Sequence, residues 1–501
     1  MSKAVVVIAA VALIFVVGAP PVIGALTELG LRRHAETIET IPETPYRLDV
    51  VDYEGGWFGS TARVEARLTD AYLDQVIAAA TQGEDETAAA VARLTMQVFL
   101  GQSLPLEVEI GHGPVFIDGG VRVGIVSTVI RPDPATAGMP ELLQSLGMPY
   151  LFEARTVTTM NGDTRFVVEI PAVEFQARQG QLAFSGLDLA GKFDLSARAV
   201  ESAGVIDFVR ADGGVQGSVD AADVTFDSDV TRYDSGLWLG DVGFEIGTLR
   251  VDGYGFEGPF SIDLTRAGAA FDSELDASGE LVTMTGGYYV DSLAGDGLAD
   301  LDGQIALADA RFDASLRSFS LEALHAYYEY SRLVSADPRS APPLIPGIQD
   351  MLYLTLSTSP EIQIGPIEFV WDGEPFAASA TIYMDASGLP ARQEFDMLDL
   401  RTLLDAVSVS AYTDMSEPMA QTLVEQAAIY QLRSNAAAMG NEIPEADLES
   451  MAEKQAIVML LGLVSQGMLV STADGYHGEL LFQDRELTIN GNFIPLPIPV
   501  F

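Results

Sequence analysis

The sequence predicts an α+β protein that is predominantly antiparallel β, either a large curved sheet or an elongated β assembly, with helices concentrated in the C-terminal third. Short alternations of apolar and polar residues fill the chain from about residue 151 to 321, with Gly, Asp and Asn between them. Helical spacing of apolar residues is clearest after residue 415. Successive side chains of a strand point to opposite faces, so a period of two indicates strands with one buried face.

The alternation is clearest where Val242, Phe244 and Ile246 are separated by Gly243 and Glu245. Turn residues that allow positive φ or form local side-chain bonds follow such segments. The same alternation occurs at Phe166–Ile170, Leu182–Phe184, Phe193–Ala197, Val224–Phe226 and Ile305–Leu307. These segments predict a run of strands joined by short turns.

Composition excludes several classes of function. The 501-residue chain has a formal net charge of −45, contains 48% hydrophobic residues and has no cysteine. The hydrophobic content excludes wholesale disorder, and the length corresponds to roughly two to four domain-sized units. Excess carboxylate repels nucleic acid, so we expect no nucleic-acid partner. Absence of cysteine excludes disulfides, thiol catalysis and Cys-ligated metals.

The N-terminus predicts a single membrane-spanning helix. Residues 4–19 are all apolar or glycine, and after two prolines the apolar run continues to Leu26. Its length fits the roughly 20 residues that span a bilayer. A cleaved signal peptide, cut near Gly24-Ala25, is the alternative. Charge does not decide the orientation, because Lys3 and Arg32-Arg33 flank opposite ends. An acidic chain without thiols suits export, so we expect anchoring in the bacterial inner membrane with the bulk in the periplasm.

Four segments are predicted. Residues 1–28 form the anchor, 29–335 a mostly β periplasmic region, 336–347 a Pro-rich linker, and 348–501 an α+β region that packs on the sheet. In the last segment, Ser416 is expected to cap a helix with Pro418 in its first turn, and a second helix opens at Pro444. The end of that helix, Ile457–Val464, is apolar nearly all round and is expected to be buried.

The N-terminal apolar run and four short motifs, at Tyr53–Ser60, Ile110–Pro114, Trp238–Gly240 and Asn490–Pro495, together resemble the YdgA-like family of bacterial envelope proteins (domain of unknown function 945). They follow one another along the chain, and Gly55 stands where the family pattern has arginine. The resemblance implies an inner-membrane-anchored envelope protein and carries no established activity. The motif residues are Tyr53, Gly56, Trp57, Phe58 and Ser60; Ile110, His112, Gly113 and Pro114; Trp238 and Gly240; and Asn490, Gly491 and Pro495.

Few residues are candidates for chemistry. His112, Gly113 and Pro114 form a turn at a strand end, where the imidazole could donate a proton or bind a ligand, or could simply bond nearby backbone. Asp296, Asp300 and Asp302 suggest a weak calcium site, or a carboxylate-rich turn, because their spacing is not that of an EF-hand loop.

Two other patterns favour structural interpretations. Gly253–Gly258 matches the letters of a dinucleotide-binding loop, but the strand-like segment after it predicts a β-turn. Trp57, Trp238 and Trp371 lie beside glycine or turns, and we expect them to pack in the core rather than to line a groove.

Together these patterns favour a non-enzymatic binding or scaffold protein of the cell envelope without a cofactor, with lipid or another apolar cargo, or an envelope protein, as its partner. The alternative is a periplasmic hydrolase that uses carboxylates or His112. A second alternative is a calcium-dependent or self-associating structural protein, which includes a homo-oligomer.

Overall fold

The computed structural model describes most of residues 46–495, together with residues 27–29 and 31–32. Outside the described part lie residues 1–26, 30, 33–45, 57, 81–102, 114, 117–121, 124, 137, 160, 178–179, 195–197, 215–216, 234–235, 256–257, 299–302, 337–343, 439–443 and 496–501.

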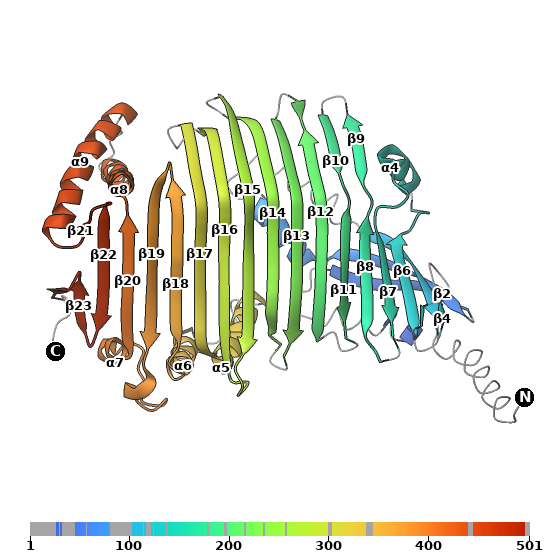
Figure 1. The fold of residues 1–501 in the computed structure, drawn as a ribbon. Coiled ribbons are helices and arrows are strands. Elements are labelled where there is room, and N and C mark those ends of the chain that lie inside the picture. Colours follow the sequence, from blue (N-terminus) through green and yellow to red (C-terminus); the bar gives the residue numbers. More distant parts are fainter. Residues whose placement is uncertain are drawn as a thin grey trace, which may run out of the picture. The chain divides into compact units, whose positions relative to one another are not determined.

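The predicted antiparallel β character is confirmed. Apart from a small hairpin formed by β4 (Val115–Phe116) and β5 (Arg122–Val123), the other 22 strands of the described chain take part in extended sheet structure (Figure 1). The chain divides into two compact units. The first contains residues 1–213 and 225–231, and the second contains residues 214–224 and 232–501.

In the first unit, antiparallel pairing runs in the order β1, β2, β3, β6, β7, β8, β11 and β12. β9 and β10 form a hairpin whose second strand also pairs with β12. The strands are β1 (Tyr46–Gly55), β2 (Gly59–Leu68), β3 (Leu104–His112), β6 (Val126–Pro132), β7 (Glu153–Thr158), β8 (Thr164–Ile170), β9 (Val173–Ala177), β10 (Gly180–Phe184), β11 (Leu187–Phe193) and β12 (Ala199–Asp212).

One face of β2 and β3 makes the buried core of the first unit. Alternate residues of each strand are buried, as the period of two predicts: Ala62, Val64, Leu106, Val108 and Ile110. Helix α2 (Asp70–Ala80) follows β2, and α4 (Met139–Leu146) contacts β9.

The strands of the second unit form an antiparallel meander, in which each strand pairs with the next from β14 to β20, β20 then pairs with β22, and β22 also pairs with β21 and β23. The longest of them, β14 to β17, contain 18 residues each. The strands are β13 (Gly217–Arg232, divided between the units), β14 (Trp238–Gly255), β15 (Gly258–Leu275), β16 (Leu281–Leu298), β17 (Gly303–Ser320), β18 (Glu361–Trp371), β19 (Glu374–Met384), β20 (Val407–Met415), β21 (Val470–Ser471), β22 (Tyr476–Gln483), β23 (Glu486–Ile489) and β24 (Asn492–Ile494).

The turn predicted at Gly253–Gly258 is confirmed. Gly255 pairs with Gly258 at the end of the β14–β15 hairpin, and β15 continues directly from it. No helix begins here, so the backbone lacks the helix N-terminus that would hold a pyrophosphate.

The alternation in β13–β17 changes phase along one line of adjacent residues, which we call the phase-change line. In β15 the apolar residues are Ile262 and Leu264 before the line and Ala267 and Ala269 after it. Three of its residues have positive φ: Asp223 (55°), Arg266 (42°) and Asp309 (49°). A residue in this conformation acts like a β-bulge and places two consecutive side chains on the same side of the strand. The line consists of Asp223, Gly247, Arg266, Asp291 and Asp309.

Pairing continues in register across this line. Ile246 faces Ala267 on one side of it, and Thr248 faces Thr265 on the other. Because neighbouring strands change phase at the same level, none of them gains a residue relative to its partner. The apolar side chains therefore remain on one face along the whole length of each strand.

The described helices lie mostly in the C-terminal part of the chain, which confirms that prediction. After β17 come α5 (Leu321–Ala336) and α6 (Leu344–Leu356), and both contact β17. The short η2 (Ala386–Gly388) and α7 (Leu400–Ala406) lie between β19 and β20.

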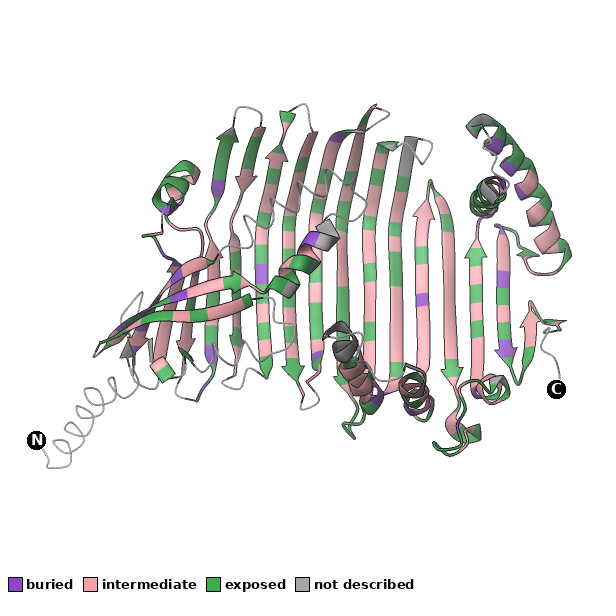
Figure 2. Cartoon of the chain, turned by 180° about the vertical axis from the view of Figure 1, so that it is seen from behind, coloured by how far each residue is buried: buried purple, intermediate pink, exposed green. Residues whose placement is uncertain are grey.

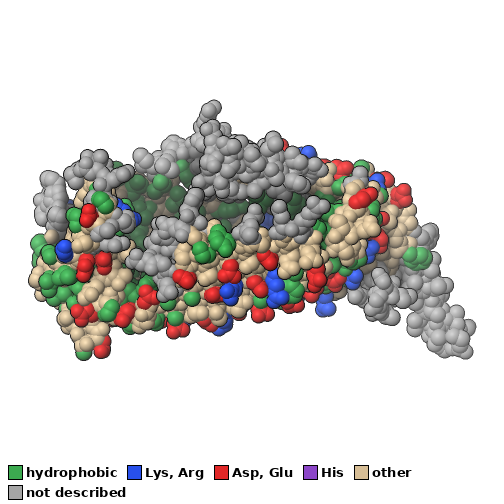
Figure 3. Space-filling view, turned by 90° about the horizontal axis from the view of Figure 1, so that it is seen from above, with side chains coloured by type: hydrophobic (Ala, Val, Ile, Leu, Met, Phe, Trp, Pro, Cys, Tyr) green, Lys and Arg blue, Asp and Glu red, His purple; other side chains and the backbone are tan. Residues whose placement is uncertain are grey.

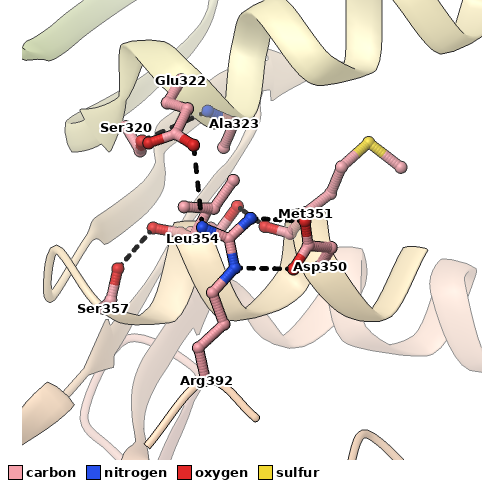
Figure 4. A network of polar contacts seen from close by, with 9 residues as sticks. Ser320, Glu322, Ala323, Asp350, Met351, Leu354, Ser357 and Arg392 are labelled. Carbon is pink, nitrogen blue, oxygen red and sulfur yellow. Dashed lines mark hydrogen bonds and ion pairs between the residues drawn. The ribbon is translucent and has the colours of Figure 1, made fainter. Parts of the chain in front are cut away.

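Polar contacts join α5, α6 and the segment after β19 (Figure 4). Arg392 pairs with Asp350 of α6 through two nitrogens, and its third nitrogen lies 3.7 Å from Glu322 of α5. Ser320 accepts a hydrogen bond from the backbone N–H of Ala323 and so caps α5. These contacts fix the helices at the end of the β17–β18 pair.

Two long helices follow β20: α8 (Glu417–Ala438) and α9 (Glu445–Ser465). The predicted cap is confirmed, because Ser416 Oγ accepts a 3.2 Å hydrogen bond from the Met419 N–H. Small residues let the two helices pack closely. The buried side chains of the two helices are Met419, Ala420, Ala428 and Ala436 of α8 and Leu448, Ala452, Ala456 and Leu460 of α9.

Expected burial of the end of α9 was wrong. Ile457, Val458 and Leu461 are 53, 69 and 65% exposed. A helix that is apolar all round presents one side to its neighbours, and here the α8–α9 contact covers only the side that carries Ala456 and Leu460. The periodicity of the sequence could not say how many neighbours the helix has.

Within the described residues, no helix has the length and apolar character needed to cross a bilayer. The predicted anchor, residues 1–28, falls almost wholly outside the described part and stays a prediction.

Candidate functional site

Two places in the structure carry candidate function: a pocket beside β2 and β3, and one face of the sheet in the second unit. The pocket begins where the buried side of β2 and β3 ends. Ser60 continues the row of Ala62 and Val64, and His112 continues the row of Val108 and Ile110. Both polar residues therefore lie on the buried face of their strands, next to the last apolar residues of the core.

Ser60 and His112 are in contact. The Ser60 Oγ lies 3.2 Å from the His112 Nε2, and the two residues are 6 and 3% exposed. The His112 backbone N–H donates to the Phe58 carbonyl at 2.9 Å. Two of the sequence motifs, 52 residues apart along the chain, thus meet in one hydrogen-bonded pair.

An open pocket of about 770 Å³ lies over this pair. Glu54 and Glu109 add carboxylates to its wall, and Phe58 adds an exposed ring. Gly56 closes the turn beside it, because a Cβ at this position would stand 2.4 Å from the Gly59 carbonyl oxygen. The pocket combines a hydroxyl, an imidazole and two acids.

Other residues of the predicted motifs in the first unit make contacts within the fold. Tyr53 packs against the core of the first unit, and the Gly113 N–H donates to the Ile125 carbonyl at 2.7 Å. Trp57 and Pro114 lie outside the described residues. The motif pieces in the second unit are Trp238, Gly240, Asn490, Gly491 and Pro495.

In the second unit, Gly240 has φ 137° and donates its N–H to Ser273 Oγ at 3.0 Å. Asn490 and Gly491 form a turn with φ 49° and 74°. The Asn490 side chain accepts from the Glu479 N–H at 2.7 Å and donates to the Gly467 carbonyl at 2.8 Å. Pro495 is exposed. Asn490 and Gly491 thus hold a turn, whereas Gly240 lies within β14.

Trp238 was expected in the core, and that expectation was wrong: the residue is 46% exposed at the start of β14. Trp371, at the end of β18, is half-buried opposite Leu307.

The calcium hypothesis gains no support from the described residues. Asp296 is exposed in β16, opposite Gln304, whereas Asp300 and Asp302 lie outside the described part. Among the described side chains, no three His, Asp or Glu residues group closely enough to hold a metal ion.

The second candidate site is the apolar face of the sheet in the second unit. Directly opposed residues on neighbouring strands lie on the same face, so register defines rows of neighbours. One row contains only apolar residues and glycine across eight strands: Val242, Phe271, Gly286, Ala314, Ile364, Ala380, Ala411 and Leu480. The next is Phe244, Ala269, Tyr288, Phe312, Ile367, Ala378, Thr413 and Gly478.

Large side chains of these rows are accessible at the β14–β17 end. Val242, Phe244, Phe271, Tyr288 and Phe312 are between 38 and 54% exposed. Phe271 packs edge-on against Tyr288 at 5.5 Å between ring centroids, and Tyr288 lies 6.4 Å from Phe312. Few residues of these strands are buried (Figure 2). We call the eight-strand surface made by the two rows the apolar face.

The opposite face is charged. Glu245 accepts a hydrogen bond from the Tyr289 hydroxyl and pairs with Arg266 at 3.3 Å. The hydrogen bond from Tyr289, with the nearby Arg266, holds the pKa of Glu245 below its usual range. Burial and the facing carboxylate of Asp241 raise the pKa of Asp272. Figure 3 shows acidic side chains gathered along the outer side of the strands and hydrophobic ones in the hollow behind them.

The sheet of the second unit is thus charged on one face and apolar on the other. The chain belongs to the DUF945 family of bacterial proteins of unknown function, whose model matches residues 1–497. This confirms the resemblance that the sequence motifs indicate. Neither a curated protein nor a solved structure matches the chain.

Proposed function

We propose that this protein is a membrane-anchored, periplasmic binding protein that holds lipid acyl chains against the apolar face. The observation that carries the proposal is the exposure of Phe244, Phe271, Tyr288 and Phe312 on one continuous surface. Soluble proteins rarely leave an apolar patch larger than a few hundred Å² open to water, and larger patches mark binding sites. The N-terminal apolar segment would keep the protein at its lipid source.

The chemistry of a sheet face favours an acyl chain over a polypeptide. Backbone donors and acceptors in the interior strands are used by neighbouring strands, so the face offers no main-chain hydrogen bonds to a peptide. A peptide bound there would leave its own amide groups unpaired, at a cost of roughly 1–3 kcal/mol each. An acyl chain has no such groups, and each CH₂ that leaves water contributes about 0.8 kcal/mol.

The dimensions of the face suit an elongated ligand. Both rows cross eight strands, from β14 to β22, and neighbouring strands are spaced by about 4.8 Å, so each row extends over about 34 Å. The polar side-chain groups in the two rows are the hydroxyls of Thr413 and Tyr288. The acids on the opposite face supply solubility without interrupting the apolar surface.

Mass spectrometry of lipids that co-purify with the full chain tests the proposal. We expect phospholipid or fatty acid well above background. Phe271→Asn should reduce the retained lipid about 10-fold or more, since burial of one such ring is worth roughly 1.5–3 kcal/mol. Asp272→Asn, the next residue and on the opposite face, is the matched control and should retain lipid. No lipid above background in the unmodified protein would refute the proposal.

A second function is favoured by the contact between Ser60 and His112. A serine hydroxyl hydrogen-bonded to an imidazole is a nucleophile with its base. In an acyl hydrolase, Ser60 Oγ would attack an ester carbonyl carbon while its proton passes to His112 Nε2 and then to the leaving alcohol. Water, deprotonated by the same imidazole, would release the acid and regenerate the serine.

A fluorophosphonate probe tests this second function because it phosphonylates only activated serines. We expect a mass increase on the peptide that contains Ser60, lost in His112→Ala and kept in Thr61→Ala, a neighbouring pocket residue. If the probe leaves Ser60 unmodified in the folded, unaltered protein, the pair is structural and closes the polar end of the β2–β3 core.

A further inference from the structure

We propose that the exposed side of α9 is a contact surface for α9 of a second copy of this chain, paired antiparallel about a two-fold axis at Val458. The surface, which we call the α9 patch, consists of Met451, Ile457, Val458 and Leu461, exposed by 46, 53, 69 and 65%. The proposal does not depend on lipid binding or on the Ser60–His112 pocket.

The α9 patch lies on the side of the helix that turns away from its own neighbours. Positions 451, 458 and 465 recur every seven residues and so form one stripe. Leu448, Ala452, Ala456 and Leu460 are at most 6% exposed and face the rest of the unit. α8 and α9 lie together at one end of the strands (Figure 1), with a 3.0 Å hydrogen bond from Gln455 to Gln431 between them.

Gly462 adds a second observation. It lies inside the helix, where glycine costs about 1 kcal/mol relative to alanine. A Cβ built at this position meets no atom within 4 Å, so no contact within this copy of the chain requires glycine there. A missing side chain beside Val458 and Leu461 lets another helix approach closely.

Charge favours a second copy in one orientation. The chain carries a net charge of −45, whereas residues 455–467 contain no charged side chain. Two copies can therefore meet here without bringing carboxylates together. In an antiparallel pair centred on Val458, the two Asp447 side chains would lie about 33 Å apart, at 1.5 Å rise per residue. This exceeds the Debye length of about 8–10 Å. Parallel pairing would place them side by side.

A bilayer surface suits the α9 patch less well. Helices that lie in the membrane interface carry Lys and Arg on their polar side. The charged residues of α9 with described, exposed side chains are Asp447, Glu453 and Lys454, of which two are acidic. Anionic lipid headgroups would be repelled.

Because the chain has no cysteine, single-cysteine variants of the full chain give an unambiguous test. Val458→Cys should form a covalent dimer on mild oxidation, because the two sulfurs would meet at the axis. Met451→Cys alone should not, since its copies would lie about 21 Å apart. Met451→Cys mixed with Ser465→Cys should crosslink, because these positions would face each other.

Glu453→Cys is the control: the residue is exposed but lies about 140° around the helix from Val458, at about 100° per residue, so its copies should not crosslink. A Val458→Glu variant should halve the mass measured by sedimentation without loss of helix. Crosslinking of Met451→Cys with itself would overturn the antiparallel arrangement. Absence of dimer from Val458→Cys would overturn the proposal, and protection of that thiol from a water-soluble reagent would then assign the α9 patch to another partner or a bilayer.

Discussion

The ring of Phe271 in β15 lies across Gly286 in β16, directly opposite it in the register. A Cβ at Gly286 would stand 2.4 Å from the Phe271 Cδ1, a distance that real contacts do not reach. Glycine therefore gives the aromatic ring its place on the apolar face, as in other sheets where an aromatic residue covers a cross-strand glycine.

The effect of Gly286→Ala on the free energy of unfolding should depend on the side chain at position 271: destabilising when Phe271 is present and stabilising when it is replaced by alanine. With Phe271 present, the new methyl displaces the ring and weakens its edge-on contact with Tyr288, so we expect a loss of about 1 kcal/mol in the free energy of unfolding. With Phe271→Ala, the same change should stabilise by roughly 0.5–1 kcal/mol, because alanine in a strand loses less entropy than glycine. Urea denaturation of the four proteins of this cycle measures both values. Gly388→Ala, where a Cβ meets nothing within 4 Å, is the control.

Positive φ at Asp309, on the phase-change line, sets an order of stability among substitutions. The left-handed conformation costs most residues about 1–2 kcal/mol, whereas glycine and asparagine adopt it readily. We expect Asp309→Gly and Asp309→Asn to be as stable as the parent, and Asp309→Val to lose about 1–2 kcal/mol. Ala308→Val, one residue away at ordinary φ, should be close to neutral. Equal stability of the glycine and valine variants would contradict this account of the line.

Acid should reveal the hydrogen bond between Tyr289 and Glu245. The folded protein holds the pKa of Glu245 below its usual value, chiefly through the Tyr289 hydroxyl. A depressed carboxyl pKa stabilises the fold above the unfolded pKa, and this contribution is lost as pH falls through the folded value. Tyr289→Phe should therefore raise the pKa of Glu245, which a carboxyl NMR titration would detect. The stability deficit of this variant should shrink below about pH 4.3. A deficit that grows in acid would exclude this explanation.

The two arginines that pair with the buried carboxylate of Glu153 in β7 should stabilise the fold jointly. Its side chain is 2% exposed and pairs with Arg131 and Arg155, which are 38 and 47% exposed. Either arginine alone can still compensate the buried carboxylate, so each single alanine variant should lose about 1 kcal/mol. The double variant leaves that charge uncompensated and should lose about 3–5 kcal/mol, more than the sum. Additive losses in urea denaturation would mean that the carboxylate reaches solvent.

Alternation and turn chemistry predicted most of the fold because they are local. Val242, Phe244 and Ile246 indicate a strand with one apolar face, and Ser416 with Pro418 marks a helix start, without knowledge of any distant residue. Burial of α9 and Trp238 could not be predicted in this way, because a period reports which side is apolar and not whether a neighbour covers it.

The candidate sites were harder to predict, for the same reason. His112 and Ser60 each stood out in short motifs, but their contact joins two strands through tertiary pairing. The signal that could have linked them is the phase of the apolar alternation, that is, which alternate positions of each strand are buried. Ser60 continues the apolar positions of β2 and His112 those of β3, so once the strands pair, the two polar residues fall on one face.

Because neighbouring strands change phase at the same line, a deletion or insertion in one strand affects how that strand matches the others. Deletion of Asp309 alone would remove the switch from β17 while β16 kept its own, so the half of β17 before residue 309 would turn Leu307 toward the charged side. If the corresponding residue were also deleted from each neighbouring strand, all these strands would again place their apolar side chains on the same face. We therefore expect the fold to tolerate a deletion or insertion at the phase-change line when all adjacent strands carry it. The same change in a single strand should disrupt the sheet.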